Sequence, residues 1–222
     1  MSMKCYFISG SPFAWRALFA LEAVGAPYEA IELHGSKGDL KTPEFLAMNP
    51  RGKVPVLLDG DIVVYESAAI LTYLDHKYPS KGLFGKTAAE AGLVTQRSEE
   101  IGHYLMPALR DVFRPVFTGQ VDEKSEQVQA GLQTAREQLS LIDAWLKDTI
   151  FIIGTEPTAA DYTLYPPIGL LMRILLNPAI VALEANILPL ADNYPALAAW
   201  AVRMEALSGY AAAYPPHWRA AA

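Results

Sequence analysis

The stretch NPRGKVPVLLDGDIVVYESAAI, residues 49–70, decides the predicted fold of the N-terminal part of the chain. Within it, the turn dipeptide Asp59-Gly60 separates two apolar runs, Val54–Leu58 and Ile62–Tyr65. Because Asp-Gly favours a tight hairpin, these runs are predicted to be antiparallel strands. Residues 66–78 follow with apolar side chains at helical spacing, so the second strand is predicted to lead directly into an amphipathic helix.

The residues before this stretch predict a strand, a helix and a second strand. The run Lys4–Ser9 favours a buried strand, Phe13–Val24 has apolar residues at helical spacing, and Tyr28–Leu33 favours another strand. A helix between two strands predicts a parallel pair with a right-handed crossover. With a short helix at Thr42–Met48, the order βαβ-α-ββα predicts an α/β domain with a mixed four-stranded sheet over residues 1–79.

The rest of the chain is predicted to be helical. Residues 80–87 have the Pro, Gly and Lys content of a linker, and strand signals almost vanish beyond them. Residues 88–222 are therefore predicted to form an all-α bundle, in which Pro107 kinks the first helix. The predicted helices are Ala88–Phe117, Lys124–Trp145, Thr158–Leu176, Pro178–Leu190 and Pro195–Leu207.

The composition narrows the class of protein. With 222 residues, of which 52% are hydrophobic, the chain has enough apolar side chain for one or two packed cores. Its net charge of -6 argues against a nucleic-acid partner, since phosphate binding needs a basic surface. No run approaches the roughly 20 apolar residues that cross a bilayer, and no export signal is recognisable, so we expect a cytoplasmic protein. Cys5 is the only cysteine and the four histidines lack ligand spacing, so we expect no metal site.

Two features of the opening stretch suit a peptide-like ligand. Val54-Pro55 is a candidate cis peptide, which would free the main chain of Val54 to pair with an extended ligand; the alternative is an ordinary trans proline. At Glu66-Ser67 a strand turns into a helix, so Ser67 could cap the helix while its amides attract a carboxylate. Glu66 could accept from an ammonium group. Together the pair suits a free α-amino acid head, although alone it would usually be only a cap.

Four motifs in order carry a resemblance to a known family. They are SPF at residues 11–13, NPRGKVPVL at 49–57, YESAAI at 65–70 and GTEPTAAD at 154–161. The set resembles the cytosolic glutathione transferases, in particular a serine-type bacterial member, and covers essentially the whole chain. The resemblance implies a thioredoxin-like domain followed by an all-helical domain, glutathione as co-substrate, and a homodimer.

The resemblance also implies roles for individual residues. Val54, beside a cis Pro55, would pair with the cysteinyl unit of glutathione, and Glu66-Ser67 would hold its γ-glutamyl end. Two lysines would hold the glycine carboxylate; for Lys41, the alternative is a solvated loop lysine. The implied glutathione-binding residues are Ser11, Phe13, Lys41, Lys53, Val54, Pro55, Glu66 and Ser67.

Ser11 is the candidate catalytic residue, because it matches the serine whose hydroxyl donates to the glutathione sulfur in serine-type relatives. A free thiol has a pKa of about 8.5, so a hydrogen bond to the thiolate raises the reactive fraction at neutral pH. The alternative is a simple N-cap before Pro12. Tyr6 and Ser9 are rivals for the sulfur contact. In other classes a strand tyrosine takes this role, but its position falls on Phe7 here, so strand alternation points Tyr6 to the other face of the sheet. Ser9 remains an alternative to Ser11. Cys5 is predicted to be a core residue.

The second substrate is expected to be a small hydrophobic electrophile bound along the kinked helix. Aromatic and Met side chains there suit an apolar molecule, and two arginines could accept an anionic one, although at least half of the set could be bundle core. The candidate residues are Tyr104, Met106, Pro107, Arg110, Phe113 and Arg114. There are two alternative functions. The first is isomerisation or peroxide reduction, which would use the same thiolate. The second is a regulator that binds glutathione without turnover.

One departure from the family pattern affects the predicted glutathione site. Relatives often have an arginine after the Glu-Ser pair, and this chain has Ala68. That arginine joins a charge network to the γ-glutamyl site, which Arg16, Glu99 or an acid of a partner subunit could rebuild here. In the helical part, Thr158 and Asp161 are predicted to cap a helix.

Overall fold

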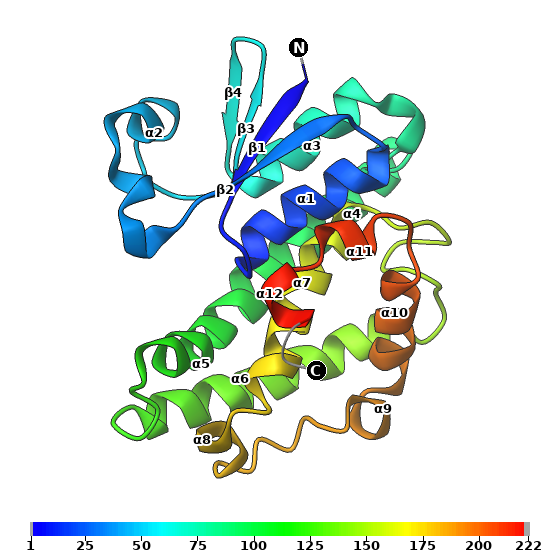
Figure 1. The fold of residues 1–222 in the computed structure, drawn as a ribbon. Helices are drawn as coiled ribbons and strands as arrows, with labels where there is room; N and C mark the ends of the chain where they lie inside the picture. The colour runs from blue at the N-terminus through cyan, green and yellow to red at the C-terminus, as the bar shows by residue number, and fades with distance from the viewer. Residues whose placement is uncertain (1, 220–222) are drawn as a thin grey trace. The chain divides into compact units, whose positions relative to one another are not determined.

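The computed structural model describes residues 2–219 (Figure 1). Contacts divide the chain into two compact units: unit 1 contains the residues up to Phe84 and those from Ala206 onward, and unit 2 is Gly85–Glu205. We call residues 206–219 the C-terminal segment. This grouping differs from the predicted helical domain, residues 88–222, because the C-terminal segment packs within unit 1.

Unit 1 is built on a mixed four-stranded sheet with the order β2-β1-β3-β4. The parallel pair places Met3 opposite Tyr28, and the antiparallel pair of β1 and β3 places Cys5 opposite Leu57. The strands are β1 (Met3–Phe7), β2 (Tyr28–Glu32), β3 (Val56–Asp59) and β4 (Ile62–Tyr65). The predicted thioredoxin-like sheet, with its parallel pair and its hairpin, is therefore confirmed.

Two long helices of unit 1, α1 (Pro12–Val24) and α3 (Ser67–Lys77), pack against each other. Their buried apolar faces, with those of the central strands, form the core. Gly25 ends α1 in the left-handed conformation, at φ 68°, which a glycine adopts without steric cost. The remaining helical elements of unit 1 are η1 (Gly35–Lys37), η2 (Asp39–Lys41), α2 (Pro43–Met48), η3 (Pro79–Lys81), α11 (Tyr210–Ala213) and α12 (Pro216–Arg219).

Unit 2 contains helices and turns without a strand across its described residues, 85–205, so the predicted all-helical fold is confirmed. Helices α5 and α6 form its most extensive contact. Gly131 permits this approach, because a Cβ there would lie 2.8 Å from the carbonyl oxygen of Ala108. The elements are α4 (Ala88–Glu100), η4 (Ile101–Leu105), α5 (Met106–Thr118), α6 (Ser125–Trp145), α7 (Ala159–Ile174), α8 (Pro178–Val181), α9 (Leu190–Asn193) and α10 (Pro195–Glu205).

Two of the predicted helices are interrupted. The helix predicted over Ala88–Phe117 is divided by η4, a π-helical segment whose last bond runs from the Met106 amide to the Ile101 carbonyl. Because Pro107 has no N–H and its ring would clash with the carbonyl four residues earlier, the helix widens just before it. The helix predicted over Pro178–Leu190 is wrong beyond its first turn, since positive φ angles break it at two residues, Glu184 and Asn186.

The predicted capping pair of α7 is present and buried. The amide and hydroxyl of Thr158 donate to Asp161 Oδ2 at 2.8 and 3.0 Å. Asp161 Oδ1 also accepts from the Ile152 amide and from Trp200 Nε1, at 3.0 and 2.8 Å. Burial raises the pKa of Asp161, and these hydrogen bonds oppose that rise. The carboxylate thus ties the start of α7 to α10 and to the loop before α7.

Candidate functional site

Ser11 lies at the N-terminus of α1 as its N-cap residue. Its amide donates to the Ile8 carbonyl at 3.1 Å, which closes a turn over Ser9 and Gly10. Its Oγ accepts from the Ala14 amide at 3.4 Å, a long bond that leaves the hydroxyl proton free to donate elsewhere. Because the amides and dipole of a helix N-terminus favour negative charge, the position suits an anionic sulfur.

The rivals for the sulfur contact lie in different surroundings. The rings of Tyr6 and Phe45 of α2 form a T-shaped pair, at 6.3 Å between centroids. Phe7 lines a cavity beside α1, so Tyr6 points to the other face of the sheet, as predicted. Ser9 Oγ shares a hydrogen bond with His217 Nδ1 at 2.7 Å. Cys5 is fully buried, and burial raises its pKa to about 12, so its thiol is in its unreactive form at neutral pH.

Asn49 organises the turn that follows α2, a role that sequence reasoning did not give it. The side chain is buried, its Nδ2 donates to the Lys53 carbonyl at 2.7 Å, and its Oδ1 accepts from the Arg51 amide at 3.1 Å. A buried polar side chain with both ends satisfied in this way stabilises one loop conformation. Asn49 thus fixes the backbone immediately before Val54.

The two predicted lysines of the site come from neighbouring segments. Gly52, at φ 58°, lies so close to η2 that a Cβ would be 3.1 Å from the Leu40 carbonyl oxygen. Lys53 follows Gly52, Lys41 follows Leu40, and both lysines are exposed. The structure therefore brings two exposed lysines to the same region of unit 1.

The bond between Val54 and Pro55 is cis, which confirms the predicted candidate. Strand β3 begins at Val56, so Val54 precedes the part of the chain that pairs in the sheet. Its side chain is half-buried, and Pro55 is buried. Val54 is thus placed at the end of a central strand, where an extended ligand could be added.

The start of α3 differs from the prediction in one respect. Glu66 is the N-cap residue and Ser67 is the first residue of the helix, so the expectation that Ser67 caps α3 is wrong. Glu66 has φ 69°, an unfavourable conformation for a residue with a Cβ, and its carboxylate lies 3.9 Å from Arg51 Nε. Such outliers concentrate at ligand sites, and the geometry leaves the α3 amides without a side-chain cap.

Arg16 is the residue that the structure brings to the Glu-Ser pair. It is buried on α1, and its Nη1 donates to Ser67 Oγ at 3.2 Å. Its guanidinium also lies 5.6 Å from the ring of Phe13, a predicted site residue that is itself exposed. Of the substitutes considered for the missing arginine at Ala68, Arg16 therefore supplies the buried cation. No sequence spacing could have identified it, since 51 residues separate Arg16 from Ser67.

The predicted electrophile residues all lie in η4 and α5 of unit 2, but they differ in exposure. Phe113 is buried in the core of the unit, and Met106 is half-buried. The other four are exposed, and three of them repeat at helical spacing on one face of α5. The exposed residues are Tyr104, Pro107, Arg110 and Arg114.

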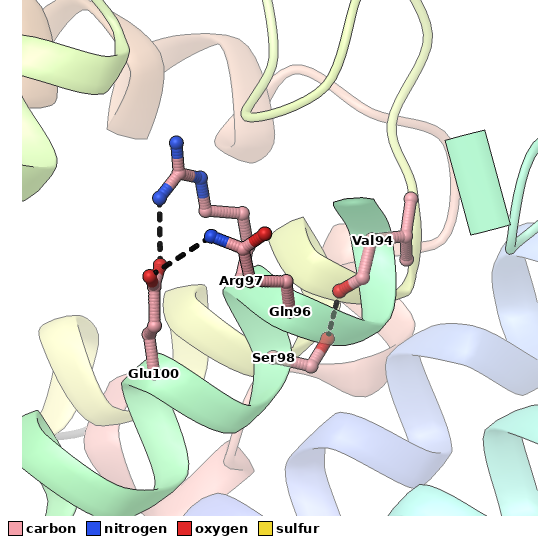
Figure 2. A network of polar contacts seen from close by, with 5 residues as sticks. All are labelled: Val94, Gln96, Arg97, Ser98 and Glu100. Carbon is pink, nitrogen blue, oxygen red and sulfur yellow. Dashed lines mark hydrogen bonds and ion pairs between the residues drawn. The ribbon is translucent and has the colours of Figure 1, made fainter. Parts of the chain in front are cut away.

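A polar network fixes the end of α4 just before this segment. Figure 2 shows its members, which are Val94, Gln96, Arg97, Ser98 and Glu100. Glu100 accepts from Arg97 at 2.7 Å and from Gln96 at 3.1 Å, and the Arg97 guanidinium lies 4.2 Å from the Trp145 ring. Burial acts to raise the pKa of Glu100, but the hydrogen bonds from Arg97 and Gln96 outweigh it, so the pKa is lowered. The network links α4 to α6.

Residues 2–219 contain neither a cluster of metal-ligating side chains nor a membrane-spanning helix. No group of three or more His, Cys, Asp or Glu side chains in that range is arranged to hold a metal ion. None of the helices there has the length and apolar character needed to span a membrane. The expectation that the chemistry needs no metal stays a prediction.

Comparisons with known proteins bear on both units. Residues 10–77 match the family model "Glutathione S-transferase, N-terminal domain", and residues 102–208 match "Glutathione S-transferase, C-terminal domain". Glutathione S-transferase 4 of Zea mays is 34% identical over 163 residues, which cover 72% of this chain and 73% of the relative.

Solved structures are similar over nearly the whole chain. A glutathione S-transferase from the Antarctic clam Laternula elliptica has a TM-score of 0.83 at 28% identity and covers 99% of this chain and 94% of its own. A glutathione transferase family member from Pseudomonas fluorescens, crystallised with two glutathione molecules, has a TM-score of 0.82 at 24% identity. The match to the Pseudomonas fluorescens structure covers 96% of this chain and 92% of the solved chain, and it shows the fold alone.

Proposed function

The chain belongs to the glutathione S-transferase family, and from this we propose that it binds glutathione in unit 1 and activates its thiol with Ser11 for attack on an apolar electrophile. The observation that carries the proposal is the position of Ser11. Its hydroxyl stands at the N-terminus of α1 and is held by its own helix only through a 3.4 Å bond. A donor so placed can turn to a sulfur anion without losing a strong hydrogen bond.

Glutathione binding is proposed to use two opposite ends of the tripeptide as anchors. At the γ-glutamyl end, Glu66 accepts from the ammonium group, while Ser67 and the uncapped α3 amides receive the carboxylate. Arg16 supports this end from behind through its bond to Ser67. At the other end, Lys41 and Lys53 are exposed and come from neighbouring segments, and they are proposed to share the glycine carboxylate.

Between these anchors, the cysteinyl unit is proposed to pair with the main chain of Val54 beside the cis Pro55. This places the thiol toward Ser11, which donates a hydrogen bond and remains protonated. Since a donor and a helix N-terminus both favour the thiolate, the thiol pKa falls below its free value of about 8.5. The thiolate then attacks an electrophilic carbon: the sulfur–carbon bond forms, and the leaving group departs with its electron pair.

The second substrate is proposed to contact the exposed face of α5. Pro107, Arg110 and Arg114 lie on that face, with Tyr104 in η4 just before it. An apolar electrophile that carries an anionic group would suit this mixture of ring and guanidinium surfaces. The buried Phe113 supports the face from the core rather than contacting a ligand.

Several finer features belong to the proposal as well. We expect a cytoplasmic homodimer in which residues 1–79 form the glutathione-binding domain. The matched relatives are mostly plant and animal proteins, so the serine-type bacterial subtype stays a prediction. Isomerisation or peroxide reduction would use the same thiolate. A panel of halonitroarenes, dienones and organic hydroperoxides, each assayed with glutathione, separates these activities from conjugation and from binding without turnover.

The decisive test compares Ser11→Ala with Ser11→Gly. Both variants lack the hydroxyl, so kcat/KM is expected to fall by about 10²-fold in each. Their stabilities differ, because an N-cap alanine costs about 1 kcal/mol whereas glycine costs only a few tenths. If activity instead follows stability, so that the glycine variant works nearly as well as the wild type, Ser11 is only a cap and the proposed role is wrong.

A further inference from the structure

The turn before Ser11 is contacted by the opposite end of the chain. Ser9 Oγ and His217 Nδ1 share a hydrogen bond of 2.7 Å across a separation of 208 residues. The next residue, Gly10, has φ 83°, and a Cβ on it would lie 3.2 Å from His217 Cε1 and 3.3 Å from Trp218 Cζ2. Both central residues of the turn are therefore in contact with α12.

Aromatic contacts that do not involve His217 anchor the C-terminal segment on α1. The Trp15 ring lies 5.6 Å from Tyr214 and 5.4 Å from Trp218, both edge to face. One turn farther along α1, Phe19 lies 6.0 Å from Tyr210. Edge-to-face pairs of this kind stabilise the packing beyond the burial of their area. Helix α12 is thus fixed independently and presents the His217 ring at a defined place.

Packing around the turn differs from side to side: Gly10 lies close against α12, whereas a cavity adjoins the turn elsewhere. A cavity of about 120 Å³ lies between the turn and the C-terminal segment, and Ser9, Gly10, Trp15, Tyr214 and Pro215 are among its lining residues. On the side that faces this cavity, close packing therefore gives the turn little restraint. The hydrogen bond between Ser9 and His217 supplies a specific restraint in addition to the packing of Gly10.

Ser11 is joined directly to the turn through the backbone. The Ser11 amide closes the turn on the Ile8 carbonyl at 3.1 Å, while its Oγ is weakly held by Ala14. We propose that His217 is a positioning residue, which holds Ser9 and through the turn sets the Ser11 hydroxyl at the glutathione sulfur. This inference rests on the proposed function, because a donor must lie accurately against the developing charge to be effective.

The test uses two substitutions at His217 and one matched control. His217→Phe keeps a ring against Trp218 and Gly10 but removes the hydrogen bond. His217→Asn places an amide near the position of Nδ1 and can restore that bond. His76→Phe is the control, since His76 is exposed on α3 and its Nδ1 lies 2.9 Å from the Thr72 carbonyl of the same helix.

Two readouts are measured for each variant: the pKa of bound glutathione from its thiolate ultraviolet absorbance, and the separate kcat and KM values. His217→Phe is expected to raise the bound thiol pKa and to lower kcat by about threefold to tenfold, with little change in the KM for glutathione. His217→Asn should recover most of kcat, and His76→Phe should match the wild type. A fold-stabilising role alone would not move the thiol pKa.

The outcomes separate this inference from the proposed function. If Ser11→Ala leaves the thiol pKa and kcat unchanged, the proposed function fails. If Ser11→Ala removes activity but His217→Phe matches the wild type in both readouts, only the positioning role is overturned. Failure of His217→Asn to restore kcat would also overturn it. Ser9→Ala should reproduce His217→Phe, and the double variant should add no further loss; additive losses contradict a shared action.

Discussion

The two helices that begin at the candidate site start in opposite ways. Helix α1 has a side-chain cap from Ser11, whose backbone is extended at φ -71° and ψ 120°. Helix α3 begins after Glu66, at φ 69°, without a side-chain cap, and the hydroxyl of Ser67 is turned to Arg16. The first start is locally relaxed, whereas the second is strained and held by a buried cation from α1.

This difference separates two tasks of one ligand site. At the start of α1, the Ser11 hydroxyl can donate to a sulfur with little loss of hydrogen bonding within the helix, which favours reaction there. A strained start leaves its amides open to a carboxylate, which favours binding at Glu66-Ser67. Substitutions at α1's cap should therefore change kcat, and substitutions around the start of α3 should change the affinity for glutathione.

Arg16→Met is expected to show the largest effect at the α3 start. It removes the buried cation behind Ser67 while roughly preserving side-chain volume, so the Kd for glutathione should rise by about tenfold with little change in kcat. Titration calorimetry measures the first quantity, and saturating turnover measures the second. Arg51→Met is the matched control, because Arg51 lies exposed at 3.9 Å from Glu66.

The control variant should raise the Kd by less than about threefold, as expected for an exposed ion pair. Equal losses at the two arginines would mean that net charge, rather than the buried contact with Ser67, supports binding. A loss confined to kcat in Arg16→Met would contradict the division of tasks between the two helices.

Glu66→Gly tests the strain at the start of α3. Glycine adopts positive φ without steric conflict, so the free energy of unfolding should rise by roughly 0.5–1 kcal/mol. Glutathione binding should weaken, since the acceptor for the ammonium group is lost. Denaturant unfolding and calorimetry on one sample set measure both. Glu44→Gly is the control, because Glu44 lies in the first turn of α2.

Glycine at position 44 should lower stability by about 1 kcal/mol and leave the Kd unchanged. The idea of a strained binding residue is wrong if Glu66→Gly destabilises the protein to the same extent as Glu44→Gly.

The features predicted correctly from the sequence depend on neighbours along the chain. The Asp59-Gly60 hairpin, the cis Val54-Pro55 bond and the strand–helix–strand order are signalled within a few residues, and the structure contains them all. The contacts that complete the site span long separations. Arg16 reaches Ser67 across 51 residues and Ser9 reaches His217 across 208, and no periodicity encodes either pair.

Errors in the prediction also have physical causes. A serine before an apolar run usually caps a helix, but here the buried guanidinium of Arg16 competes for the Ser67 hydroxyl. In unit 2, the apolar run Pro178–Leu190 has helical spacing, yet Glu184 and Asn186 adopt positive φ and end the helix. Tertiary contacts and backbone conformation therefore override the helix propensity of single residues, which is weak.

The smallest expected effect concerns the far end of α3, where Asp59 of the hairpin accepts from Tyr73 at 2.5 Å and from Lys77. The hydrogen bond from Lys77 and then that from Tyr73 lower the pKa of Asp59 below its ordinary value of 3.8. A lowered folded pKa adds stability above the unfolded pKa, and this is lost as the pH falls through the folded pKa. Asp59→Asn should therefore lower stability by about 0.5 kcal/mol at pH 7, and this difference from the wild type should vanish in acid. Urea unfolding between neutral and strongly acidic pH measures this difference in stability.

Glutathione binding by Asp59→Asn gives a second readout. Because Asp59 holds the end of α3 and not its start, the Kd for glutathione at pH 7 should stay unchanged. A higher Kd would show that the strained start depends on the whole helix.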